Sequence, residues 1–234
     1  MDSRSVLGIL LLLILGTVSE IGPVRAQNIE LGLEIGIGSA SLSYDAGPPY
    51  TELIGIPEWD TRPRLCYSIL AFVQVPISKS LSLLSGLRLS QVGDKASHSN
   101  STYRREKRQQ YLSVPIRIRY NLFDSPIYVS AGPEFGYLIR AVSTWEAPSP
   151  YPPYPQTDKK FNGFLKRINV VLGAGIGASY KIFGRRMYAQ VYHNEGVTGN
   201  IRDIEGQRFG IRRIGGYNWR TRETTLNIGY LFGN

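Results

Sequence analysis

Two histidines, His98 and His193, are the side chains of this sequence best suited to act as general bases near neutral pH. Acyl-transfer chemistry would pair such a base with a hydroxyl or thiol nucleophile. Glu195 and Thr198 follow His193 closely, whereas His98 stands in a polar stretch, and no pattern fixes a nucleophile beside either ring. The single cysteine, Cys66, is far from both histidines in the sequence. We therefore expect no enzyme, no metal site and no cofactor.

Basic side chains are concentrated in two stretches, residues 94–108 and 199–221. The chain has 27 Lys and Arg against 18 Asp and Glu, which gives a net charge of +9. Arginine pairs bidentately with phosphate, so these stretches suit nucleic acid, anionic lipid headgroups or an acidic partner. The candidate contact residues are Arg104, Arg105, Lys107, Arg108, Arg208, Arg212 and Arg213.

The beginning of the chain predicts export. Arg4 precedes an apolar run, Val6–Val18, which is followed by small residues up to Ala26. This order is typical of a cleaved signal peptide, and the apolar run is short for a transmembrane helix. We expect residues 1–26 to be the signal peptide and residues 27–234 to form one mature domain. Export makes nucleic acid the least suitable of the three partner classes.

The elements that would position these side chains are best seen in residues 111–140, YLSVPIRIRYNLFDSPIYVSAGPEFGYLIR. Apolar residues alternate with polar or small ones on both sides of a turn at residues 121–126, which predicts a β-hairpin with one apolar face. Both a soluble sandwich and a membrane barrel alternate in this way. Arg117, Arg119 and Glu134 lie in mid-strand, where a sandwich would expose them to water and a barrel would enclose them.

The whole mature chain favours the barrel. Long connections at residues 45–63, 94–108, 143–163 and 199–221 alternate with short ones, which is typical of a bacterial outer-membrane barrel and has no reason to occur in a sandwich. We predict an all-β, eight-stranded antiparallel up-and-down transmembrane barrel. Its strands are expected at residues 29–44, 64–75, 81–93, 111–120, 127–139, 164–181, 186–196 and 222–232.

The inward side of this barrel is predicted to carry a buried ion-pair network. Its members are expected to be Glu34, Arg88, Arg117, Arg119 and Glu134. Pairing the hairpin strands around their turn places Ser113 near Glu134, with Arg88 at a similar height, while Glu34 approaches the other two arginines across the interior. An unpaired charge in this place would cost several kcal/mol. The same polar set would also suit a path for protons or small solutes, and both interpretations stay open.

Five stretches resemble the outer-membrane β-barrel family of Bacteroidetes typified by PorT. They are FVQVPISKSLSLLSGLRLSQVGDK (72–95), YLSVPIRIRYNLF (111–123), YVSAGPEFGYLI (128–139), VVLGAGIGASY (170–180) and TLNIGYLF (225–232). The resemblance implies an eight-stranded barrel in the outer membrane of a Gram-negative, Bacteroidetes-like bacterium. The best-known member of that family is a component of the type IX secretion machinery, and many relatives have no such role.

Three functions remain for the barrel at this point. The first is a non-catalytic protein that acts through extracellular loops and envelope partners, for which the resemblance implies a PorT-like role in type IX secretion or envelope assembly. The second is a narrow porin-like channel for small solutes. The third is an enzyme that hydrolyses outer-leaflet lipid with His193, for which no adjacent serine is apparent. Expected partners are outer-membrane lipid, lipopolysaccharide and secretion-machinery proteins.

Overall fold

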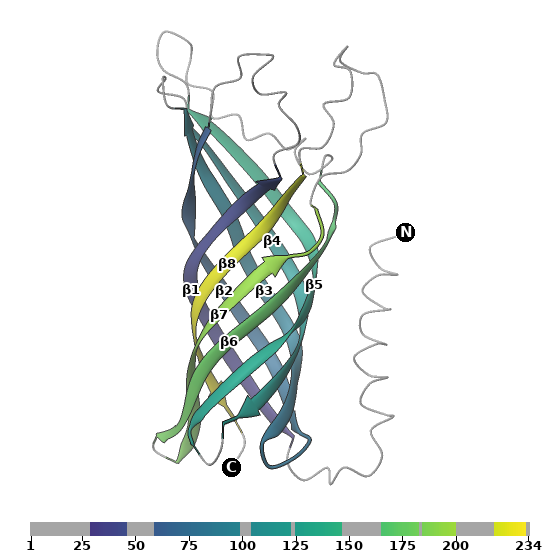
Figure 1. Ribbon diagram of the computed structural model, residues 1–234, viewed down its shortest axis with the longest axis vertical. Helices are drawn as coiled ribbons and strands as arrows, with labels where there is room; N and C mark the ends of the chain where they lie inside the picture. The colour runs from purple at the N-terminus through teal and green to yellow at the C-terminus, as the bar shows by residue number, and fades with distance from the viewer. Residues whose placement is uncertain are drawn as a thin grey trace.

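The computed structural model is a closed barrel of eight antiparallel strands in sequence order (Figure 1). The structure describes residues 29–45, 59–98, 104–122, 125–146, 165–182, 184–199 and 218–232, so the expected signal peptide lies outside the described residues. The predicted fold class is confirmed. The strands are β1 (Glu30–Asp45), β2 (Trp59–Pro76), β3 (Leu81–His98), β4 (Arg104–Asn121), β5 (Ile127–Glu146), β6 (Ile168–Ile182), β7 (Arg185–Gly196) and β8 (Asn218–Leu231).

Alternation along each strand separates an exposed apolar wall from a buried interior. On β1, Leu33 and Ile35 are 46% and 59% exposed, whereas Glu34 between them is 2% exposed. Successive side chains point to opposite faces of a strand, so every second residue faces outward. An outer wall made of exposed Leu, Ile, Val and Tyr is the surface that lipid covers in a membrane barrel.

The strands β2 to β5 continue beyond the rest of the wall (Figure 1). The ladder between β2 and β3 extends to the pair Trp59–His98, and the ladder between β4 and β5 extends to Arg104–Glu146. The ladder between β5 and β6 ends at Tyr137–Ile168. These four strands therefore form a projecting sheet above the apolar wall.

This projection corrects the predicted loop at residues 94–108. Residues 94–98 belong to β3 and residues 104–108 belong to β4, so the connection is confined to residues 99–103. His98, expected in a polar loop, is the last residue of β3. A strand that stands outside the lipid has no apolar face, so alternation in hydropathy cannot reveal it.

The opposite end of the barrel has short connections. Residues 77–80 join β2 to β3, and residues 183–184 join β6 to β7. Gly184 in the second turn has a φ of 76°, a conformation that suits glycine. Within the described ranges there is no helix with the length and hydropathy needed to span a membrane.

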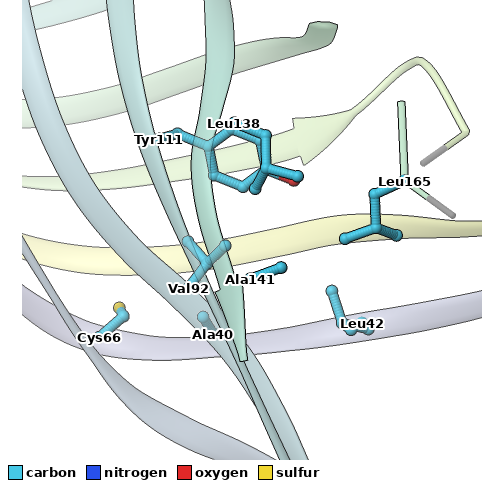
Figure 2. Packing of buried hydrophobic residues seen from close by; sticks show 8 residues of the cluster. All are labelled: Ala40, Leu42, Cys66, Val92, Tyr111, Leu138, Ala141 and Leu165. Carbon is cyan, nitrogen blue, oxygen red and sulfur yellow. The ribbon is translucent and has the colours of Figure 1, made fainter. Parts of the chain in front are cut away.

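The interior is built in layers along the barrel. An outer apolar layer lies toward the projecting end, and Figure 2 shows its side chains; they are Ala40, Leu42, Cys66, Val92, Tyr111, Leu138, Ala141 and Leu165. An inner apolar layer lies toward the short turns and consists of Leu70, Phe72, Leu84, Tyr128, Tyr188 and Leu231. Charged side chains fill the space between the two layers.

Candidate functional site

Arg88 on β3 is the centre of the charged layer. Its Nη1 lies 3.0 Å from Glu134 Oε1 on β5, and its Nη2 lies 2.6 Å from Glu223 Oε1 on β8. Ser113 on β4 donates a hydrogen bond of 2.6 Å to the same oxygen of Glu134. The Arg88 side chain is only 2% exposed, so these contacts replace its hydration. The structure thus brings together Ser113 and Glu134, which the hairpin pairing places side by side, and Arg88, which was expected at a similar height on the neighbouring strand.

Arg117 on β4 joins this group to the opposite wall. Its Nη1 lies 3.2 Å from Glu34 Oε1 on β1, and its Nη2 lies 3.7 Å from Glu134 Oε2. The guanidinium also stands 4.2 Å from the centre of the Tyr192 ring, within the range of a cation–π contact. Arg117 therefore links carboxylates from two distant strands.

Glu34 is held by several donors besides Arg117. The Tyr188 hydroxyl donates to Glu34 Oε2 at 2.7 Å, and Gln190 Nε2 donates to the same oxygen at 2.8 Å. Both donors come from β7, on the far side of β8 from β1. A buried carboxylate with this many partners is the arrangement in which a charge is tolerated away from water.

Arg119 does not form the ion pair that was predicted for it. Within the described part of the chain, its contacts are with an amide and two rings rather than with a carboxylate. Its Nη1 donates to Gln74 Oε1 at 3.1 Å, and the guanidinium lies 3.9 Å and 4.3 Å from the ring centres of Tyr128 and Tyr188. The expected ion pair is therefore replaced by cation–π contacts in the inner apolar layer.

Two residues that contact the buried arginines were missed in the sequence. Glu223 binds Arg88 and also accepts a hydrogen bond of 3.2 Å from Asn194 Nδ2. Tyr128 supplies one of the rings against Arg119. Glu223 could have been identified because it alternates with outward-facing residues in the same way as Thr225 and Asn227, which face inward on the same strand.

The buried charges of the barrel and its projecting sheet balance in number among the described residues. The buried charged side chains of the described residues are four cations, Arg88, Lys107, Arg117 and Arg119, and four anions, Glu34, Asp94, Glu134 and Glu223. A cavity of about 20 Å³ lies beside Arg88 and Asn194. That volume holds about one water molecule. Among the described residues, the buried cations and anions are therefore equal in number.

The predicted basic contact residues do not all lie outside the barrel. Arg104 and Arg108 are exposed on β4, as expected, and Arg105 belongs to the same strand. Lys107 is 3% exposed and faces the interior, because it is offset by one position from its exposed neighbours. The assignment of Lys107 to an outer contact was therefore wrong. Arg208, Arg212 and Arg213 lie outside the described residues.

His193 lies on the outer wall beside a hydroxyl, although not the one suggested by the sequence. Its Nδ1 lies 2.8 Å from Thr224 Oγ1, and its Nε2 lies 3.7 Å from Glu195. Thr198 instead donates to Asn169 and accepts from a backbone amide. His193 on β7 and Thr224 on β8 are opposite each other in a regular antiparallel ladder. The backbone amides of the two strands are therefore not directed at a shared oxyanion position.

Three solved structures resemble this chain at 8–12% sequence identity. No curated protein matches the chain. The structure is similar to Neisserial surface protein A (NspA), with 9% identity, a TM-score of 0.43, and coverage of 87% of this chain and 98% of that one. It is also similar to the translocator domain of the autotransporter NalP from Neisseria meningitidis, with 8% identity, a TM-score of 0.38 and coverage of 98% and 97%. For the N-terminal β-barrel domain of Pseudomonas aeruginosa OprF, the identity is 12%, the TM-score 0.29 and the coverage 86% and 97%.

A family model describes the greater part of the chain. The model is that of the outer membrane protein beta-barrel domain, and it matches residues 25–200. These residues include β1 to β7 of the closed wall. The protein therefore belongs to the outer membrane protein beta-barrel domain family and is a β-barrel of the Gram-negative outer membrane.

Proposed function

We propose that this outer-membrane barrel is a non-conducting, non-catalytic protein that works through its projecting end, where it meets lipid and other envelope proteins. The observation that carries the proposal is the filled interior. Paired charges occupy the middle of the barrel, apolar side chains close it on both sides, and the cavity beside Arg88 has room for about one water molecule. An eight-stranded barrel is narrow enough for side chains to fill it completely.

We further infer a PorT-like role in type IX secretion or envelope assembly in a Bacteroidetes-like bacterium. The support is the resemblance of residues 72–95, 111–123, 128–139, 170–180 and 225–232, whose described members belong to strands and to the short turns between them. The general rule for these barrels puts short turns in the periplasm and the opposite end outside the cell. In this orientation the projecting sheet formed by β2 to β5 is the part that outer-surface partners would meet.

The first test concerns conduction. Purified protein inserted into planar lipid bilayers is expected to give no current steps above those of the lipid alone, because charged and apolar layers block the barrel. The variant Arg88→Ala is expected to remain silent as well, since the two apolar layers do not depend on Arg88. A stable ohmic current from the wild-type protein would favour the narrow channel instead.

The second test concerns secretion. Deleting the gene in its own bacterium is expected to leave type IX cargo inside the cell, measured by immunoblotting of culture medium and periplasm. A plasmid copy of the wild-type gene should restore the cargo to the medium. Normal secretion in the deletion strain would exclude the type IX role. It would not change the conclusion drawn from the conduction measurement.

A further inference from the structure

The outer wall of the projecting sheet carries a group of basic side chains around one carboxylate. We call this group the basic face; it consists of Arg62, Arg64, Lys95, Arg104, Glu106 and Arg108. Glu106 forms two ion pairs. Its Oε1 lies 2.5 Å from Arg64 Nε, and its Oε2 lies 3.2 Å from Arg108 Nη2. Five cations and one anion give the basic face a net charge of +4.

The strand register gathers these side chains into one area. Lys95 on β3 is directly opposite Arg62 on one neighbouring strand and Glu106 on the other. Arg104 is two positions from Glu106 on β4, and side chains two positions apart share a face. The shared carboxylate orients the Arg64 and Arg108 guanidinium groups, which leaves less side-chain freedom to be lost when a ligand binds.

The basic face lies directly beyond the apolar wall. On the same strands, Leu65, Tyr67 and Leu89 are 66%, 48% and 47% exposed, as expected for residues that meet lipid chains. Arg62 precedes Leu65 by only three positions on β2, roughly 10 Å along a strand. In a membrane this is the level of the lipid headgroups, so the nearest neighbour of the basic face is the charged part of the outer leaflet.

We propose that the basic face binds the phosphate groups of a phosphorylated glycolipid in the outer leaflet. Arginine forks donate two parallel hydrogen bonds to phosphate oxygens, and Lys95 supplies a further positive charge. Charge alone would also suit an acidic protein. The continuity of the basic face with the lipid-covered wall favours the lipid. This binding rests on the proposed contact of the projecting end with lipid and specifies it, but it does not require the secretion role.

The test uses the triple variant Lys95→Gln, Arg104→Gln and Arg108→Gln, whose three side chains are exposed. The matched control removes three exposed charges at the opposite end, Lys79→Gln, Lys181→Gln and Arg185→Gln. Each protein in neutral detergent is titrated with bisphosphorylated lipid A and with the same lipid after its phosphates have been removed. The change in migration of unheated protein on a denaturing gel checks that each barrel is folded.

The wild-type protein and the control variant are expected to bind the phosphorylated lipid at least tenfold more tightly than the phosphate-free lipid. The triple variant should lose at least tenfold of its affinity for the phosphorylated form. Added salt should weaken the wild-type interaction, because exposed charges are screened. If the triple variant does not fold, Lys95→Gln and Arg104→Gln are tested singly, and each should weaken binding about threefold.

Three results would overturn the lipid proposal. They are equal affinity of the wild-type protein for both lipids, unchanged affinity in the folded triple or single variants, and an equal loss in the control variant. Secretion of cargo by a strain carrying the triple variant is measured separately. Loss of lipid binding with normal secretion would support the lipid site and leave the type IX role to its own test.

Discussion

Replacing Arg88 by methionine is expected to lower the free energy of unfolding by about 3–5 kcal/mol, because breaking a buried ion pair leaves its partners charged and uncompensated. Glu134 and Glu223, which are 5% and 4% exposed, would both lose their closest cation. The measurement is a urea titration of the protein folded into lipid vesicles, followed by far-ultraviolet circular dichroism. This variant should be among the least stable single substitutions in the barrel.

Two controls separate the loss of pairing from the loss of an arginine. Arg186→Met removes an arginine whose side chain is 41% exposed and paired with Glu30. Exposed pairs contribute little, so its cost should stay under about 1 kcal/mol. In the double variant Arg88→Met with Glu223→Gln, the numbers of buried cations and anions are equal again, and much of the stability should return. A double variant that loses the sum of the two single losses would contradict the proposed pairing.

Gly132→Ala is expected to destabilise the barrel by about 1–3 kcal/mol through overpacking. A methyl group at Gly132 on β5 would collide with the backbone carbonyl oxygen of Ile116 on β4. A backbone atom cannot move aside without distorting the β4–β5 ladder, and this ladder holds Arg117 and Glu134 in the charged layer. The urea titration used for Arg88→Met gives the effect.

The same strand offers a matched control for this prediction. A methyl group at Gly136 would find its nearest atoms at 3.5 Å, which is ordinary contact. Gly136→Ala should therefore leave the stability unchanged or raise it slightly, since alanine loses less conformational freedom than glycine on folding. Equal losses in Gly132→Ala and Gly136→Ala would show that the carbonyl of Ile116 is not the cause.

The sequence was most informative where strands cross the apolar wall. There, alternation assigns each side chain to the lipid or to the interior, and the pairing of adjacent strands around a short turn brings Ser113 and Glu134 together. The position of Arg88 beside them then follows from pairing one further strand. These are local relations, so they can be worked out from spacing alone.

The errors arose where that alternation stops or where strands meet across the interior. Residues 104–108 stand outside the apolar wall and have polar residues on both faces, so they were assigned to a loop and Lys107 to the surface. Glu223 was inside the strand expected at residues 222–232 but only one position from its expected start, whereas the strand begins at Asn218 and Glu223 lies well within it. The partner of Arg119 depends on which side chains meet across the barrel, and spacing within one strand contains no information on that.

The distribution of buried charges among the strands has a consequence for assembly in the membrane. Arg88 lies on β3, and Arg117 and Arg119 lie on β4, whereas Glu34, Glu134 and Glu223 come from β1, β5 and β8. A β3–β4 hairpin entering the bilayer alone would carry three arginines without the glutamates that neutralise two of them, at a cost of about 2–4 kcal/mol per charge near the midplane. We therefore expect insertion to be concerted, with the first and last strands already gathered around the middle ones before the arginines leave water.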